Sequence, residues 1–98
     1  MEQIAKDLQN FLVQMHYQPE TVSHKMEHYM EHLFHLLPVD DEQLLCGYFG
    51  LFGHEQQPLV EIARKANLSQ EDCMAHIDEL LHQLAITPEW QLLRQVNK

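Results

Sequence analysis

The sequence predicts an all-α fold in a single domain. Apolar residues recur at spacings of three and four along almost the whole chain, which is the period of an amphipathic helix. No stretch alternates polar and apolar residues as a strand would, and no internal repeat is visible. The length agrees with this prediction, because 98 residues with a 45% hydrophobic share suit one globular unit spanning residues 1–98.

Two amphipathic helices are expected to form an N-terminal hairpin over residues 1–37. The first helix should end before Pro19, because the residue preceding a proline disfavours the helical conformation. Thr21 or Ser23 can cap the second helix, and Pro38 stops it. The expected apolar stripes are Ile4, Leu8, Phe11, Leu12 and Met15 in the first helix and Val22, Met26, Met30, Leu33 and Leu37 in the second.

Four shorter helices are expected in residues 38–98. Asp40 and Gln43 have the spacing of a capping box at the start of the first of these, and Gly50 supplies its C-terminal stop. A polar loop then leads to Pro58, which suits the first turn of the next helix. The apolar positions of these two helices are Leu44, Leu45, Tyr48 and Phe49, then Leu59, Ile62, Ala63 and Ala66.

The last two helices have their own start signals. Asn67 tolerates the left-handed conformation of a tight turn, and Ser69 is a strong N-cap for the helix that follows. Thr87 and Pro88 together predict the start of a final helix. The core positions expected here are Cys73, Ile77, Leu80, Leu81, Leu84, Trp90 and Leu93.

Residues 59–80 have the spacing of a helix-turn-helix motif. Such a motif needs a small residue where the helices cross, here Ala63, and a left-handed residue in the turn, here Asn67. The apolar residues expected to lock the helices are Ile62, Ala66, Leu68 and Cys73. The next such position falls on His76, with Ile77 beside it, so the match is imperfect. An ordinary helical hairpin with a three-residue turn is the alternative.

From about Leu37 to Leu84 the chain resembles region four, the promoter-reading C-terminal domain of bacterial primary sigma factors. The resemblance implies a helix-turn-helix fold and contact with RNA polymerase, and it leaves the N-terminal hairpin unexplained. The matching motifs are LP (Leu37-Pro38), FGL (Phe49-Gly50-Leu51), EIAR (Glu61 to Arg64), LS (Leu68-Ser69), and then Leu81 and Leu84.

The second helix of the motif departs from this family. The resemblance implies an arginine-rich helix that reads bases, but the matching positions here are Gln70, Glu71, Asp72, Met74 and Ala75. No Lys or Arg occurs in residues 69–84, which contain the acids Glu71, Asp72, Asp78 and Glu79. Only Gln70 and Gln83 could read base edges there, and only Arg64 and Lys65 on the preceding helix could contact phosphates.

The charge of the whole chain also disfavours nucleic acid as a ligand. Six Lys and Arg against fifteen Asp and Glu give a formal net charge of −9. Binding to a phosphate backbone depends on clustered cations, so a protein partner with a basic surface is the better expectation.

Histidines form a stripe along the second helix. His24, His28, His32 and His35 recur at spacings of four, four and three, within about 80° of one face. Imidazoles one turn apart can share Zn²⁺, but natural zinc sites usually draw ligands from several elements. We therefore expect a solvated polar face and no metal, with a pH-responsive contact surface as an alternative.

No catalytic constellation is visible, and we expect neither enzymatic activity nor a cofactor. Cys46 and Cys73 lie at apolar helical positions, where free cysteine behaves as a small hydrophobe. His76 is expected to be partly buried and hydrogen-bonded. The aromatic residues Tyr48, Phe49, Phe52 and Trp90 are expected to be core or interface anchors.

The sequence favours a small cytoplasmic regulatory protein that uses a sigma-like helix-turn-helix scaffold for protein–protein contact. The expected partners are RNA polymerase, a sigma factor or another DNA-binding regulator, and a homodimer is a further expectation. No membrane association is expected. One alternative is a dimeric sequence-specific DNA-binding regulator using Arg64, Lys65 and Gln70; another is a helical adaptor or chaperone, for example in a secretion system. The candidate partner-binding residues are Gln70, Glu71, Asp72, Met74, Asp78 and Glu79.

Overall fold

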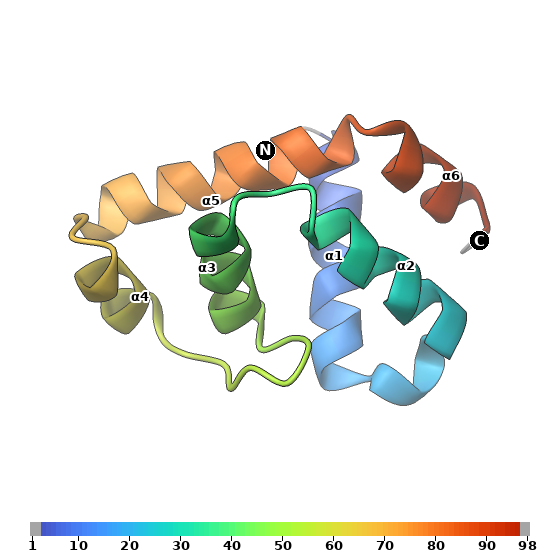
Figure 1. Ribbon diagram of the computed structural model, residues 1–98, viewed down its shortest axis with the longest axis horizontal. Coiled ribbons are helices and arrows are strands. Elements are labelled where there is room, and N and C mark those ends of the chain that lie inside the picture. Colours follow the sequence, from blue (N-terminus) through green and yellow to red (C-terminus); the bar gives the residue numbers. More distant parts are fainter. Residues whose placement is uncertain (1–2, 97–98) are drawn as a thin grey trace.

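The computed structural model describes residues 3–96 (Figure 1). These residues form α-helices joined by loops, and none of them lies in a strand. This confirms the all-α prediction. The helices are α1 (Gln3–Tyr17), α2 (His24–Phe34), α3 (Val39–Phe49), α4 (Leu59–Lys65), α5 (Gln70–Ala85) and α6 (Pro88–Val96), with a 3-10 helix, η1 (Pro19–Thr21), between α1 and α2. None of the helices described is both long and apolar enough to cross a membrane.

Helix α5 runs along one edge of the molecule and contacts α1, α4 and α6 (Figure 1). Helix α4 packs near its N-terminal end and α1 packs across its C-terminal half, while α6 continues beyond the C-terminal end of α5 and turns toward α2. Helix α3 lies between α4 and α1 and contacts both, while α2 packs against α6. The first two helices reverse direction at η1, as a hairpin does, but each packs mainly on a helix from the second half of the chain.

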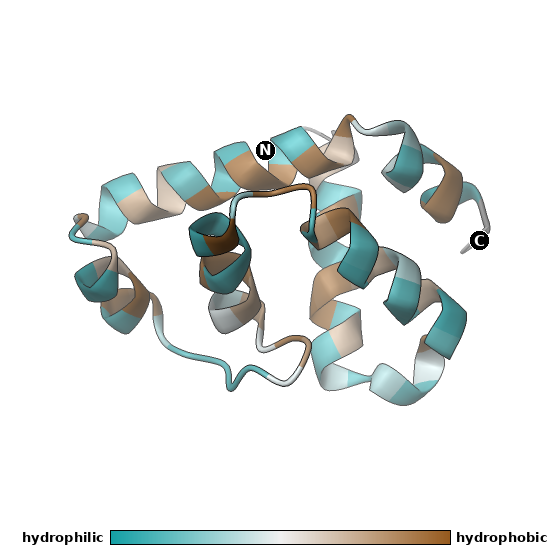
Figure 2. Cartoon of the chain, in the orientation of Figure 1, coloured by the Kyte–Doolittle hydropathy of each residue, from teal (hydrophilic) through white to brown (hydrophobic). Residues whose placement is uncertain are grey.

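The core draws side chains from every helix. Figure 2 shows α5 hydrophilic along its outer edge and hydrophobic along the edge that faces the other helices. No polar or charged side chain is buried among the described residues. The largest fully buried side chains are Trp90, Phe34, Leu8, Leu12, Met30, Leu33, Leu45, Ile77, Leu80, Leu81 and Leu84. The side chain of Ile4, expected in the first apolar stripe, lies outside the described part of the chain.

Most of the predicted helix starts and stops are confirmed. Ser23 Oγ accepts a hydrogen bond from the Met26 amide at 3.2 Å, and Ser69 Oγ accepts one from the Asp72 amide at 3.0 Å. Thr87 caps α6 in the same way. These hydroxyls satisfy amides that have no partner within the helix.

Two predicted helix starts are corrected. Helix α3 begins at Val39 with Pro38 as its N-cap and no side-chain cap, so Asp40 and Gln43 do not form a capping box. Pro38 is extended, at φ −55° and ψ 151°, and the chain enters the helix directly after it, which places Asp40 inside the first turn. An acidic residue there still interacts favourably with the helix dipole. Pro58 likewise is the N-cap of α4 and not part of its first turn.

The contact between α4 and α5 gives a test of core packing. Ala63 is 2% exposed, so we expect Ala63→Leu to overpack this contact and lower the free energy of unfolding by about 1–3 kcal/mol. Ala66→Leu, one turn later at an exposed position, is the matched control and should change it by less than about 0.5 kcal/mol. Urea titration followed by circular dichroism measures both. Equal midpoints for the two variants would contradict the packing described.

Candidate functional site

A tight turn between α4 and α5 fixes the direction of α5. Asn67 adopts a left-handed conformation at φ 58°, as predicted. The Leu68 amide donates a 3.0 Å hydrogen bond to the Ala63 carbonyl, which closes the end of α4. Ser69 then caps α5, so the two helices are joined by residues 66–69 alone. The first half of α5 therefore packs on α4 and α3 along its inner side and leaves its outer side exposed.

Only part of the predicted lock between α4 and α5 is buried. Ile62, Ala63, Cys73 and Ile77 are all at most 5% exposed. Ala66 and Leu68 are exposed, Leu68 by 38%, which corrects the prediction that they would be buried. Both lie in or beside the turn, where no third helix covers them. Leu59 is half-buried and packs against the core.

The outer side of α5 carries four carboxylates, which we call the acidic face: Glu71, Asp72, Asp78 and Glu79. All four are exposed. Residues seven apart on a helix differ by only about 20°, so Glu71 aligns with Asp78 and Asp72 aligns with Glu79 in two parallel rows. No Lys or Arg occurs anywhere in α5.

The two remaining partner-binding candidates lie elsewhere on α5. Gln70 is exposed at the first turn of the helix. Met74 is half-buried, packs against the core and accepts a hydrogen bond from the Tyr48 hydroxyl at 3.8 Å. The contact with Tyr48 places Met74 on the side of α5 that faces α3.

The cations nearest to α5 in sequence already have partners. Arg64 forms an ion pair with Glu61 on the same helix. Lys65 Nζ donates a 3.0 Å hydrogen bond to Gln57 Oε1. Both side chains are exposed, but neither adds to a basic patch, because α5 beside them is acidic.

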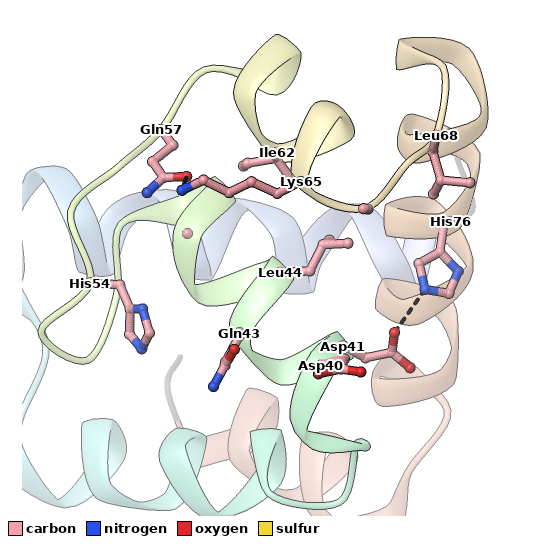
Figure 3. A pocket seen from close by; sticks show the side chains of 12 residues that line it. Asp40, Asp41, Gln43, Leu44, His54, Gln57, Ile62, Lys65, Leu68 and His76 are labelled. Carbon is pink, nitrogen blue, oxygen red and sulfur yellow. Dashed lines mark hydrogen bonds and ion pairs between the residues drawn. The ribbon is translucent and has the colours of Figure 1, made fainter.

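A cleft of about 630 Å³ lies where α3, α4 and α5 meet the loop before α4. Figure 3 shows His76 of α5 turned toward Asp41 of α3, with Lys65 and Gln57 together at the other end of the cleft. His76 Nε2 and Asp41 Oδ1 are 2.9 Å apart, which confirms that His76 is partly buried and hydrogen-bonded. The sequence did not reveal this pair, because 35 residues separate its members. The pair joins α3 to α5 across the cleft.

A second groove, of about 590 Å³, lies between α1, α3 and the start of α4. Its lining is neutral and includes the exposed side chains of Val13 and Tyr17 beside Tyr48 and Leu59. Sequence reasoning missed this groove as well, because its walls come from three separate segments.

Both cysteines are buried, as predicted, and both are held in the thiol form. Burial raises the pKa of Cys46 to about 11, with Glu42 and Glu31 adding to the effect. Burial also raises the pKa of Cys73. Because the thiolate is the nucleophile and the metal ligand, neither sulfur is poised for such chemistry at neutral pH.

The histidine stripe on α2 is exposed along its whole length, which confirms its predicted place opposite the apolar side chains. His28 and His32 are neighbours, and their Nε2 atoms lie 3.2 Å apart. His35 Nδ1 lies 2.9 Å from Glu42 Oε1. In the described part of the chain, no three or more His, Cys, Asp or Glu side chains are grouped so that they could hold one metal ion.

Comparison of the chain with models of known families, with curated proteins and with solved structures finds no match. The resemblance to region four of sigma factors therefore rests on the sequence motifs between residues 37 and 84.

Proposed function

We propose that this chain is a small regulatory protein that binds another protein through the acidic face of α5, on a sigma-like helix-turn-helix scaffold. The partner class is the transcription machinery: RNA polymerase, a sigma factor or another DNA-binding regulator. One observation carries the proposal. The helix that would read bases in the family presents four exposed carboxylates and no cation.

The geometry around α4 and α5 supports the scaffold part of the proposal. A helix-turn-helix needs a left-handed turn residue and a small buried residue at the crossing, and Asn67 and Ala63 have those properties. The FGL motif ends α3, with Phe49 and Leu51 buried and Gly50 left-handed between them. The three residues thus have structural reasons to occur in that order.

The charges support a basic protein surface over DNA as the partner. Four carboxylates on α5 would face the phosphates of a duplex if the helix entered a groove, and they would repel them. Arg64 and Lys65 are the nearby cations, and they are engaged with Glu61 and Gln57. The same carboxylates attract a basic protein surface and speed its association.

A binding experiment with purified RNA polymerase core and purified primary sigma factor tests the proposal. We expect the parent protein to bind one of these two proteins, with an affinity that falls as the salt concentration rises. Neutralising the acidic face with Glu71→Gln, Asp72→Asn, Asp78→Asn and Glu79→Gln should weaken binding by about tenfold or more. Fluorescence polarisation of the labelled protein gives the dissociation constants.

The matched control removes four exposed acids elsewhere: Glu20→Gln, Glu27→Gln, Glu55→Gln and Glu89→Gln. Because both variants lose the same number of charges, a local contact predicts that the control keeps its affinity within about threefold. If the two variants lose binding affinity equally, the loss follows from net charge alone, and this result would contradict a contact made by the acidic face. Tight, sequence-dependent binding to a promoter duplex at physiological salt would instead establish the DNA-binding alternative.

A further inference from the structure

Two histidines on the exposed side of α2 are placed as a chelating pair. His28 and His32 lie one helical turn apart, and their Nε2 atoms are 3.2 Å from each other. Their rings are nearly perpendicular, with centroids 4.6 Å apart. Both side chains are exposed, so an ion can reach the two nitrogens from solvent.

The separation of the two nitrogens matches what one metal ion requires. Imidazole nitrogens bind first-row ions at about 2.0–2.1 Å, so two of them at an angle of about 90–110° lie roughly 2.9–3.4 Å apart. The observed 3.2 Å falls inside this range. The distance between the two nitrogens therefore suits a single shared ion.

We propose that His28 and His32 form a bidentate surface site for a divalent first-row transition metal ion of the Cu²⁺, Ni²⁺ or Zn²⁺ class. The two Nε2 atoms are the protein ligands, and water fills the other positions. The hydrogen bond between the rings places one proton on one of these nitrogens. On binding, that proton moves to Nδ1 of the same ring, which leaves both Nε2 lone pairs for the ion. Imidazole suits these ions, whereas Mg²⁺ and Ca²⁺ prefer oxygen ligands.

The charges around the pair favour a cation. Glu31 lies three residues after His28, at the spacing that makes side chains neighbours on a helix surface. Lys25 lies three residues before His28, at the same spacing, but its Nζ is held over the Tyr29 ring at 5.9 Å from the centroid. The chain as a whole carries −9, which raises the local concentration of cations.

The next histidine of the stripe is held apart from the pair. His35 Nδ1 is bonded to Glu42 at 2.9 Å, and its ring centroid lies 6.3 Å from that of His32. The proposed site is therefore the His28–His32 pair alone. The pair lies on a different helix from the acidic face, so the test of this metal site is independent of the test of the proposed function.

Titration calorimetry of the full chain with Ni²⁺ tests the site. We expect saturable binding of one ion by the parent. The double variant His28→Gln with His32→Gln should bind about a hundredfold more weakly, because the second ligand of a chelate acts at high effective concentration. The control variant, His24→Gln with His54→Gln, also loses two exposed imidazoles and should keep its affinity within about threefold.

Two further measurements examine the geometry. The electron paramagnetic resonance spectrum of the Cu²⁺-loaded parent should show two equatorial nitrogen ligands, and that of the double variant should not. Because this spacing chelates only when residues 28–32 are helical, Ni²⁺ should raise the Tm of the parent and leave the double variant unchanged. Equal Ni²⁺ affinity in the parent and the double variant, or no saturable binding by the parent below about 1 mM, would overturn the proposal.

Discussion

Replacing Trp90 with alanine is expected to lower the free energy of unfolding by about 3–5 kcal/mol. Its side chain is 1% exposed and packs against Phe11 of α1, with ring centroids 5.7 Å apart. Removing it takes away the main anchor by which α6 joins the core and leaves a cavity where α1 and α6 meet. Chemical denaturation followed by far-ultraviolet circular dichroism measures the effect, since the chain has only this tryptophan for fluorescence.

Trp90→Phe is the matched variant, and it separates the ring from its polar atom. Trp90 Nε1 is buried and has no hydrogen-bond partner among the described residues. An unpaired buried N–H costs about 1–3 kcal/mol, so phenylalanine removes that cost while it keeps most of the apolar surface. We expect a net loss below about 1.5 kcal/mol. A loss equal to that of Trp90→Ala would show that the N–H stabilises the fold.

The second large effect is expected at Gly50, where alanine should lower the free energy of unfolding by about 2–4 kcal/mol. Gly50 has φ +68°, which side chains rarely adopt. A Cβ added there would lie 2.7 Å from His16 Nδ1 and 2.8 Å from Gln56 Cβ. His16 Nδ1 also donates a 3.0 Å hydrogen bond to the Gly50 carbonyl, so displacing the ring breaks the link between α1 and the end of α3.

Gly53→Ala is the control for backbone strain alone. Gly53 has φ +84°, but no atom lies within 4 Å of an added Cβ. Gly53→Ala should lower the free energy of unfolding by about 1–2 kcal/mol, so the difference between the two variants measures the steric clash at Gly50. Urea titration of both gives that difference. If Gly53→Ala is as destabilising as Gly50→Ala, the clash with His16 contributes nothing.

The sequence predicted the secondary structure well where the signal was local. Ser23, Ser69 and Thr87 cap helices because a hydroxyl at that place satisfies an amide within the next three residues. Gly50 and Asn67 end helices because they tolerate positive φ. The prediction failed at Asp40. The N-cap of α3 is Pro38, which places Asp40 inside the first turn of the helix and not at its N-cap.

The candidate site was predicted less completely. The four acids of the acidic face could be found from the sequence, because their exposure follows from their distance around the helix from Cys73 and Ile77. The half-burial of Met74 could not be read from the sequence, since its contact with Tyr48 comes from a different helix. The cleft with Asp41 and His76 was not found at all.

By itself the sequence determined which segments are helical, most of the places where they begin and end, and which side of each is apolar, because these depend mainly on residues within about one turn of each other. Only the tertiary structure decided which helices pack against each other. Arg94 meets Asp7 across 87 residues at 3.0 Å, and Trp90 reaches Phe11 across a similar distance in the chain. The tertiary structure also exposed Ala66 and Leu68, because no third helix covers the turn between α4 and α5. Burial depends on which surfaces the folded chain brings together, and periodicity along one helix does not contain that information.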